Sequence, residues 1–375
     1  MGMARNPFAP TFGASPHILI GRDQILDEIR DTFEDGPQSP TRTVLFVGAR
    51  GTGKTVMLNA YEDLAASLGW LVVRETASKG LLERLTRDHL PRLLTEHSER
   101  PRGRLTQLSV STPFGGGGGT VADRFPAEST LRSQVMELTD ILRPRETGLM
   151  VTVDEVQSAD REELRKLGEL VQVARREQRD LAFAAAGLRW AVEDLLNDDV
   201  VTFLRRAERY SLGEVPIPEV AEAFVQTFGD AGRHIDEKDA SRAARATYGY
   251  PFLVQLVGHR IWLRNPQAEQ VTHADVVDGI EQATQRLGTL VHEPAVAKLS
   301  DIDKAYLRAM AKDGEGPSRT GDIAARMQVS AQYAGVYRDR LITNGTIEPA
   351  GYGLVRFSVP YLGSYLRRRD RNRSH

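Results

Sequence analysis

Short, unbroken apolar runs alternate with amphipathic segments along the first half of the chain. Residues 43–47, 70–74, 149–153 and 181–186 are runs of mostly β-branched, aromatic or small residues. Segments with apolar residues at helical spacing flank or separate them, at residues 25–33, 55–68, 81–96, 128–142 and 160–174. Continuous apolar runs of this length are typical of strands buried on both faces of a parallel sheet. The pattern therefore predicts a three-layer α/β core, which we place at residues 18–215.

The strand pattern stops after this core, and amphipathic helices follow it. They are expected at residues 220–228, 237–248, 252–263 and 274–287. We interpret residues 216–292 as a small helical domain, or lid, docked on the sheet domain.

The last segment has a different pattern. Short helices at residues 301–312, 320–327 and 330–344 precede two strands, at 346–349 and 354–359, that are joined by a glycine-containing turn. Three helices and a hairpin in this order are typical of a winged helix-turn-helix, whose third helix can enter a major groove. We place it at residues 297–368, with an extended arm at 1–17 and a basic tail at 369–375.

A phosphate-binding motif lies between the first predicted strand of the core and the helix after it. Gly48-Ala49-Arg50-Gly51-Thr52-Gly53-Lys54-Thr55 fits G-x-x-x-x-G-K-[ST], and Val56 continues the helix. The glycines Gly48, Gly51 and Gly53 allow positive φ angles, so that backbone N–H groups can surround a phosphate. The helix N-terminus favours the anion, Lys54 can reach the β- and γ-phosphates, and the Thr55 hydroxyl can bind Mg²⁺.

Two carboxylates follow the apolar strand at residues 149–153. Asp154 and Glu155 would lie at the carboxyl edge of a parallel sheet, the same edge as the phosphate loop. In that position Asp154 can hold Mg²⁺ through water, and Glu155 can orient and deprotonate the attacking water. The alternative is a solvated acidic turn, which the strand and helix order between the two motifs disfavours.

Two further segments have both a functional and a structural interpretation. Ile20, Gly21 and Arg22, which follow a short apolar run, could lie against an adenine ring or could form an ordinary turn into a helix. Arg205 and Arg206 could supply a guanidinium to a γ-phosphate, in cis or across a subunit interface, or could belong to a solvated helix face.

Composition adds limits rather than a function. The 375 residues are 41% hydrophobic and 27% charged, as in an ordinary globular protein. The absence of cysteine excludes disulfides, thiolate nucleophiles and Cys-based zinc sites. No apolar run approaches the length of a membrane span and no signal peptide is evident, so a cytoplasmic protein without membrane contact is expected. Five consecutive glycines at 115–119 predict a mobile hairpin tip, with a role in gripping DNA or a partner as an alternative.

The C-terminal segment is basic although the chain as a whole is not. The net charge is -2, but residues 297–375 carry +6. Arg367, Arg368 and Arg369 suit contacts to a phosphate backbone, and Gln332 and Arg338 are the side chains of the third helix suited to read bases. Winged helices also serve as protein interfaces, so DNA and a protein partner both remain candidates.

The ordered segments IGRD, GARGTGKT, LMVTVDEV, FLRRAERYSL and GYPFLVQL resemble an AAA+ ATPase of the STAND type, close to the archaeal replication-initiator-like ATPases. The resemblance covers nearly the whole chain. It implies that residues 20–22 lie by the adenine, that residues 48–56 hold the phosphates of ATP or ADP, and that Asp154 and Glu155 form the metal-binding and water-activating pair. It also implies that Gly249-Tyr250-Pro251 is the STAND G-x-P signature, with Pro251 packed on the nucleotide.

The chain departs from the family pattern in two places. The family usually has a polar residue, often Asn, at the end of the strand after the acidic pair, whereas residues 181–187 offer none and Arg189 is the nearest candidate. Initiator-type members carry a lid arginine where this chain has Pro251. We therefore expect a slow, nucleotide-governed switch that controls DNA binding or partner assembly. The alternatives are an adaptor that retains ADP and a multimeric DNA loader or motor, in which Arg205 or Arg206 would act between subunits of a homo-oligomer.

Overall fold

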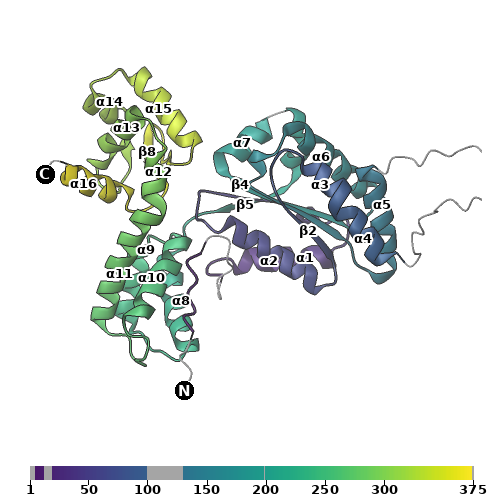
Figure 1. Ribbon diagram of the computed structural model, residues 1–375, viewed down its shortest axis with the longest axis horizontal. Coiled ribbons are helices and arrows are strands. Elements are labelled where there is room, and N and C mark those ends of the chain that lie inside the picture. Colours follow the sequence, from purple (N-terminus) through teal and green to yellow (C-terminus); the bar gives the residue numbers. More distant parts are fainter. Residues whose placement is uncertain (1–4, 12–18, 99–129, 198, 374–375) are drawn as a thin grey trace, which may run out of the picture.

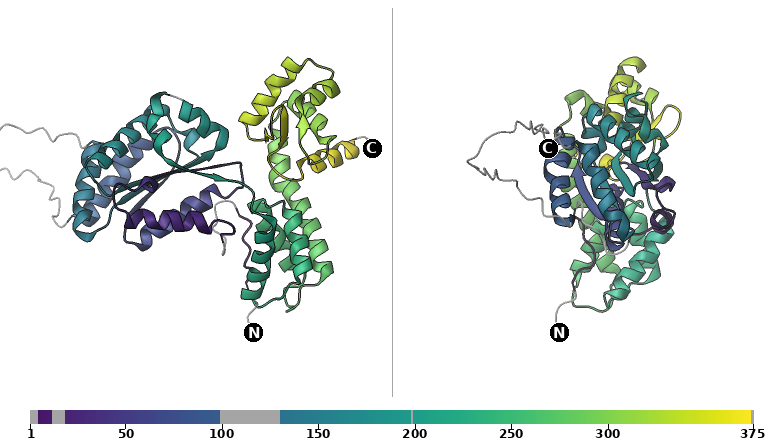
Figure 2. Two further views of the ribbon diagram at one scale, coloured as in Figure 1. Left: turned by 180° about the vertical axis from the view of Figure 1, so that it is seen from behind. Right: turned by 90° about the vertical axis from the view of Figure 1, so that its right-hand side faces the viewer.

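The computed structural model describes residues 5–11, 19–98, 130–197 and 199–373. The α/β core lies beside a column formed by the helical lid and the C-terminal domain (Figures 1 and 2). The glycine run at 115–119 lies outside the described residues, so the prediction of a loop tip there is not tested.

The core sheet within the described residues has five parallel strands in the order β2-β3-β4-β1-β5. Their bounds are β1 Thr43–Gly48, β2 Leu71–Thr76, β3 Leu149–Asp154, β4 Leu181–Leu188 and β5 Glu208–Leu212. The first four are the predicted apolar runs. The fifth was missed: a helix face was one interpretation of Arg205 and Arg206 and no strand was expected after them, whereas a 3-10 helix, Asp199–Arg206, is followed by β5.

Helices cover both faces of this sheet and give it three layers. Val44 and Phe46 of β1 pack on one side with α1 (Asp23–Glu34) and α2 (Lys54–Ser67). Leu45 and Val47 point to the other side, because successive residues of a strand face opposite ways. That second layer consists of α3 (Leu81–Arg84), α4 (Leu90–His97), α5 (Leu131–Leu142), α6 (Arg161–Arg176) and α7 (Arg189–Asn197). The predicted three-layer α/β core is confirmed.

The lid is a separate helical cluster with its own apolar interior. It comprises α8 (Ile217–Asp230), α9 (Glu237–Thr247), α10 (Pro251–Arg264) and α11 (His273–Leu287). Phe8 of the N-terminal arm is 4% exposed and packs on Phe224 and Phe228. The described part of the arm is thus docked on the lid by a buried aromatic ring.

A continuous helical stretch joins the lid to the C-terminal domain. α11 runs through a π-helical turn, Gly288–His292, directly into α12 (Glu293–Ala297). The stretch is visible as one rod between the two domains (Figure 1). Residues 293–296, which lie between the two predicted domains, are therefore helical, and the C-terminal domain follows directly on a helical extension of the lid.

The C-terminal domain contains the predicted helices and hairpin. They are α13 (Asp301–Ala311), α14 (Thr320–Met327), α15 (Ala331–Thr343), β7 (Ile347–Pro349) and β8 (Leu354–Phe357). A short strand, β6 (Ser318–Arg319), completes an antiparallel sheet in the order β6-β8-β7.

Most of the predicted basic tail at 369–375 is helical in the structure. Residues 369–373 belong to α16 (Leu362–Arg373), whose Leu362 and Leu366 are buried in the C-terminal core. The apolar residues Leu362 and Leu366, four positions apart, allow this segment to pack as a helix in spite of its charge.

The three domains also contact one another away from the chain connections. Arg356 of β8 forms an ion pair with Glu214 at 2.8 Å, and α15 lies against α7 of the core. Tyr361 donates a hydrogen bond to the carbonyl of Ala246 in the lid at 2.8 Å. Among the described helices, none combines the length and the hydrophobicity needed to cross a membrane.

Candidate nucleotide site

The loop between β1 and α2 has the backbone that phosphate binding requires. Gly51 and Gly53 have φ angles of 74° and 89°, in the region that favours glycine. Gly48 has no positive φ, contrary to our expectation; it is needed because a Cβ there would lie 2.4 Å from the carbonyl oxygen of Leu212. The loop therefore places the N-terminus of α2 at the carboxyl edge of the sheet. The N–H groups of this helix end are free to bind an anion.

Lys54 is held inside this loop. Its Nζ donates to the carbonyl of Ala49 at 2.8 Å, and Thr52 Oγ1 donates to the same oxygen at 2.9 Å. The side chain is 6% exposed, and burial lowers the pKa of its ammonium although the carboxylates of Glu155 and Asp154 oppose the shift. A buried cation with only a carbonyl partner can gain strongly from an anion, so the ammonium is suited to a phosphate.

Thr55 and Asp154 come together from distant parts of the chain. Thr55 Oγ1 donates to Asp154 Oδ2 at 2.7 Å, and the other oxygen, Oδ1, accepts the N–H of Glu155 at 2.8 Å. A hydroxyl and a carboxylate side by side are the oxygen ligands that Mg²⁺ uses together with nucleotide phosphates. The pair fits a magnesium ion at the predicted place.

Glu155 follows Asp154 in a left-handed backbone conformation, with φ of 53°. It faces the cavity next to the phosphate loop, and its carboxylate accepts a hydrogen bond from Gln157 Nε2. Gln157 was missed from the sequence, because no spacing rule marks a glutamine two residues after an acidic pair.

A cavity of about 450 Å³ opens at this edge of the sheet. This volume is within the range of roughly 300–1,000 Å³ found for small-ligand pockets. The predicted residues that line it are Ile20, Arg22, Arg50, Gly51, Thr52, Gly53, Lys54, Thr55, Val56, Glu155 and Pro251. Leu19, Met57 and Val215 add apolar surface that suits a nucleotide base.

Four of the residues predicted to bind the nucleotide or the metal ion do not line the cavity. Gly48, Ala49 and Asp154 support it from behind through the contacts described above. Gly21 is required by packing, since its φ is 66° and a Cβ would lie 2.7 Å from Glu219 Oε2. Arg22 lines the cavity, but one of its guanidinium nitrogens donates to the carbonyl of Gly213 at 2.8 Å, so that it links this segment to the chain between core and lid.

The lid closes one side of the site through the start of α10. Tyr250 Oη donates to the carbonyl of Arg50 at 2.9 Å, and the N–H of Phe252 approaches the carbonyl of Gly51 at 3.4 Å. Tyr250 is 3% exposed, and burial raises the pKa of its hydroxyl, which keeps it a neutral donor. Gly51 also cannot be replaced here, because a Cβ would lie 1.9 Å from Tyr250 Oη.

Several of these lid and arm residues were not predicted. Tyr250 was noted only as the middle of the Gly-Tyr-Pro segment. The residues that line the cavity without having been predicted to do so include Phe252, Val254, Gln255, Ala9 and Thr11. The N–H of Ala9 bonds to Gln255 Oε1 at 3.1 Å, which places the arm at the rim. Only tertiary packing brings residues 9 and 255 together.

The structure does not bring Arg205 and Arg206 to the cavity. Arg205 Nε donates to the carbonyl of Leu196 at 2.6 Å. Arg206 lines a different pocket with Thr43, the first residue of β1, and thus lies at the amino edge of the sheet, opposite the phosphate loop. Neither arginine lines the cavity of this structure, and a role toward a γ-phosphate, in cis or across a subunit interface, stays a prediction.

The residues suggested for DNA contacts are spread over two helices. Gln332 is exposed on α15, and Arg338 forms an ion pair with its neighbour Asp339 at 2.8 Å. On α16, Arg367 donates to the carbonyl of Ala311 at 2.5 Å and Arg369 contacts Tyr365 Oη at 3.5 Å, whereas Arg368 is exposed. Arg367 is thus partly committed to holding α16 in place.

Comparison with known proteins agrees with this architecture. Residues 18–183 match the family model of the AAA ATPase domain, and residues 289–366 match a domain of unknown function (DUF8462). No curated protein matches the chain in sequence.

Solved structures extend the likeness to the whole chain. The Walker-type ATPase of Pyrococcus abyssi aligns with a TM-score of 0.64 at 15% identity, over 93% of this chain and 96% of that one. The ORC2 protein of Aeropyrum pernix, in ADPNP-ADP complexes, aligns with a TM-score of 0.61 at 13% identity, over 97% and 98% of the two chains. Residues 18–183 therefore match the AAA ATPase domain, and the chain as a whole shares the fold of these two solved structures.

Proposed function

We propose that this protein is an ATP-binding switch that hydrolyses ATP slowly and whose nucleotide state controls what its C-terminal domain binds. ATP or ADP with Mg²⁺ would occupy the cavity at the phosphate loop. Lys54 would neutralise the phosphates, Thr55 and Asp154 would hold the metal ion, and Glu155 would take a proton from the attacking water. The protein would act in the cytoplasm, as its sequence suggests.

The observation that carries this proposal is the contact between lid and phosphate loop. Tyr250 Oη bonds to the backbone of Arg50, and Pro251 and Phe252 line the same cavity. A nucleotide that changes the backbone of the loop must therefore also shift the start of α10. Since the lid continues as helix into α12, this shift would reach the C-terminal domain as a rigid-body motion.

Three features favour slow turnover. Pro251 stands where the resemblance implies a lid arginine. β4 ends without a polar side chain, and neither Arg205 nor Arg206 faces the described cavity. An arginine that stabilises the transferred phosphate accelerates hydrolysis by roughly 10³- to 10⁵-fold in related chemistry, so its absence in cis would leave a long-lived ATP state unless a second subunit supplied it.

DNA is the first candidate ligand of the C-terminal domain. The helices and hairpin have the order of a winged helix-turn-helix, and residues 297–375 carry a net charge of +6. Arg368 is exposed on α16, so it is available for a phosphate. Such contacts would give DNA binding that weakens with salt.

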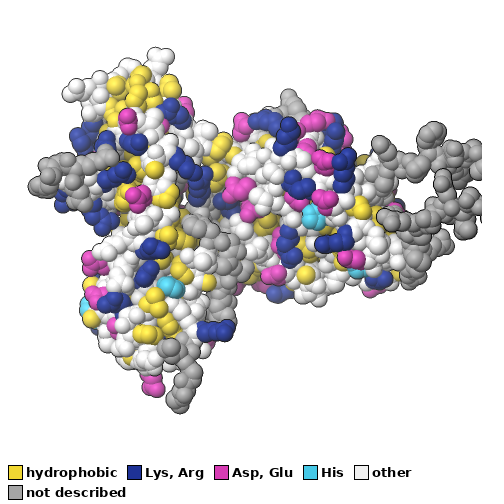
Figure 3. All heavy atoms as spheres, in the orientation of Figure 1, with side chains coloured by type: hydrophobic (Ala, Val, Ile, Leu, Met, Phe, Trp, Pro, Cys, Tyr) yellow, Lys and Arg dark blue, Asp and Glu magenta, His cyan; other side chains and the backbone are white. Residues whose placement is uncertain are grey.

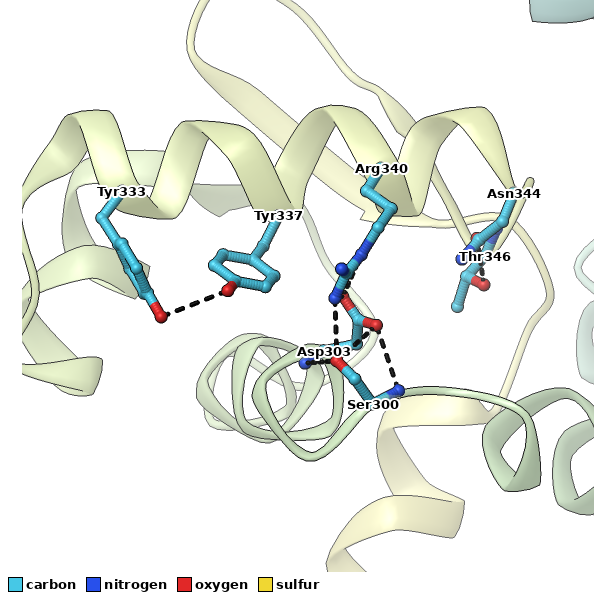
Figure 4. A network of polar contacts seen from close by, with 7 residues as sticks. All are labelled: Ser300, Asp303, Tyr333, Tyr337, Arg340, Asn344 and Thr346. Carbon is cyan, nitrogen blue, oxygen red and sulfur yellow. Dashed lines mark hydrogen bonds and ion pairs between the residues drawn. The ribbon is translucent and has the colours of Figure 1, made fainter.

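A protein partner is the second candidate, and the surface of α15 favours it. Tyr333 and Val336 are 41% and 61% exposed, and hydrophobic side chains gather over the end of the domain where α14 and α15 lie (Figure 3). The arginines of this helix are already paired: Arg338 with Asp339, and Arg340 with Asp303 at 2.5 Å. Figure 4 shows Arg340 bound to Asp303 of α13, beside a hydrogen-bonded pair of Tyr333 and Tyr337.

The test is the nucleotide dependence of binding by the full-length protein. Bound nucleotide would be identified after denaturing the purified protein, and ATP turnover would be measured with and without DNA. A switch predicts slow turnover and a different affinity for DNA or partner in the ADP and non-hydrolysable ATP states. Tightly retained ADP without turnover would favour the adaptor, and DNA-stimulated turnover by a homo-oligomer would favour the loader or motor.

A further inference from the structure

The side chain of Gln157 connects Glu155 to the end of β4. Gln157 lies in the 3-10 turn Val156–Ser158, two residues after the carboxylate. Its Nε2 donates to Glu155 Oε2, and its Oε1 accepts the backbone N–H of Leu188 at 3.3 Å. The amide therefore links Glu155 to the neighbouring strand.

The partners of this amide fix its orientation. A backbone N–H can only donate, so the atom that faces Leu188 must be the carbonyl oxygen, and the NH₂ group must face Glu155. An ionised carboxylate accepts hydrogen bonds at both oxygens, so an NH₂ group that donates to Glu155 is compatible with its role as a general base.

The end of β4 is shaped to admit Gln157. A Cβ on Gly187 would lie 2.8 Å from Gln157 Oε1 and 2.9 Å from Val156 Cγ1. Any larger residue at position 187 would therefore displace the amide. The apolar strand β4, which supplies no polar side chain at its end, instead makes room for one from the turn after β3.

Glu155 needs such a support. Its φ of 53° is uncommon for a residue with a side chain and costs roughly 1–2 kcal/mol, so the conformation must be held by its surroundings. Its N–H is bound to Asp154 Oδ1, which fixes the backbone, while Gln157 holds the carboxylate. In this orientation Glu155 lines the cavity.

We propose that Gln157 is a positioning residue that holds the Glu155 carboxylate toward the water that attacks ATP. Gln157 does not line the cavity itself and acts only through Glu155. The proposal rests on the function proposed above, in which Glu155 is the base.

The test compares two substitutions in the full-length protein. Gln157→Met removes both hydrogen bonds with little change in length. Gln157→Glu keeps an acceptor for the Leu188 N–H but replaces the donor with a second carboxylate opposite Glu155. We expect both to lower kcat by about 10- to 100-fold, because small errors in the placement of reacting groups have effects of this size. KM and the ATP dissociation constant should stay within about twofold of the wild-type values, because Gln157 does not line the cavity in which ATP would bind.

The pair separates positioning from a merely structural role. If Gln157 only anchored the end of β4, Gln157→Glu would keep wild-type kcat and Gln157→Met would lower the thermal midpoint together with activity. That pattern, or a wild-type or increased kcat in both variants, would overturn the proposal. Ser158→Ala, an exposed neighbour in the same turn, is the matched control and should behave as wild type.

A third variant separates this proposal from the one on which it rests. Glu155→Gln should lower turnover by about 10²- to 10⁴-fold, and adding Gln157→Met to it should have no further effect, because both act through one carboxylate. If Glu155→Gln hydrolyses ATP like wild type, Glu155 is not the base and the proposed mechanism fails with it. If Glu155→Gln is inactive and the Gln157 variants are fully active, only the positioning role fails.

Discussion

At the scale of single residues, Lys54 has the clearest expected effect. Its ammonium is buried and bonded only to a loop carbonyl, so it is the cation available to the β- and γ-phosphates. Lys54→Ala should weaken ATP binding by at least about tenfold, since a hydrogen bond to a charged group contributes roughly 1.5–3 kcal/mol. Calorimetry would measure this; an unchanged affinity would contradict the phosphate-binding role. Lys79→Ala, outside the cavity lining, serves as control.

Glu155 should affect chemistry and not binding. In Glu155→Gln the amide can still accept a hydrogen bond from water but cannot take its proton. We expect an unchanged ATP dissociation constant and a fall in turnover of about 10²- to 10⁴-fold, the usual contribution of a general base. Single-turnover hydrolysis with excess protein checks this, and wild-type turnover would assign the base elsewhere.

At the scale of elements, the hydroxyl of Tyr250 connects α10 to the phosphate loop. Tyr250→Phe removes the hydrogen bond to the carbonyl of Arg50 and should destabilise the nucleotide-free protein by about 0.5–1.5 kcal/mol. The difference in hydrogen exchange of residues 251–264 between the free and ATP-bound states should also become smaller, because this hydrogen bond no longer connects the phosphate loop to α10.

A nearby tyrosine provides the control for this prediction. Tyr248 is 48% exposed and contacts Tyr361 through its ring, so Tyr248→Phe keeps its ring contact. If Tyr250→Phe and Tyr248→Phe give the same exchange difference as wild type, the hydroxyl does not couple the lid to the loop.

At the scale of the whole molecule, the salt dependence of DNA binding distinguishes the two candidate ligands. Arg368→Ala in the full-length protein should reduce the slope of log affinity against log salt by roughly 0.9 if the side chain contacts a phosphate. Arg367 is less suitable for this test, since it also holds α16 against α13. Arg30→Ala, on the exposed side of α1, is the control.

The outcome also decides between DNA and protein. Equal salt slopes of DNA affinity for Arg368→Ala and wild type, or no DNA affinity at low salt, would contradict a phosphate contact by Arg368. The surface of Tyr333 and Val336 would then be the candidate binding face. In that case Val336→Asp should weaken partner binding without changing the fold, because Val336 is 61% exposed.

The stability of the protein should depend on pH through a histidine buried at the junction of the lid and the C-terminal domain. His292 is 2% exposed in the turn between α11 and α12, and its ring lies 5.6 Å from that of Tyr365 of α16. Burial lowers the pKa of His292 from its ordinary 6.5 to about 4, against a hydrogen bond to the backbone of Pro360. The unfolded chain therefore binds a proton more readily than the folded one between these values.

The sign of the effect follows from linkage. The contribution of neutral His292 to stability is complete above pH 6.5 and falls as the pH drops toward 4. Between pH 7 and pH 5 the free energy of unfolding of the wild type should fall by roughly 2 kcal/mol more than that of His292→Phe. Each pKa unit of the shift corresponds to about 1.4 kcal/mol. Denaturant titrations at both pH values measure this; identical losses in the two proteins would show that His292 is not buried in solution.

Most of the core and the centre of the site were determined by local sequence. Apolar runs specified β1 to β4 because strands buried on both faces need such residues along their whole length. Gly51, Gly53, Lys54 and Thr55 could be assigned from the sequence motif, because their spacing and backbone conformations depend mainly on adjacent residues. Asp154 could be placed opposite Thr55 because the carboxyl ends of parallel strands share one edge.

Only the tertiary structure decided the contacts made between distant elements. Edge strand β5 has a polar pattern and was not predicted. Its pairing with β1, and not its own sequence, makes it a strand. The position of Arg206 at the opposite edge from the loop, the docking of Phe8 on the lid and the bond from Tyr250 to Arg50 all depend on how helices pack. Local propensity and spacing act over a few residues, whereas these contacts join residues tens to hundreds of positions apart, so the packed fold alone determines them.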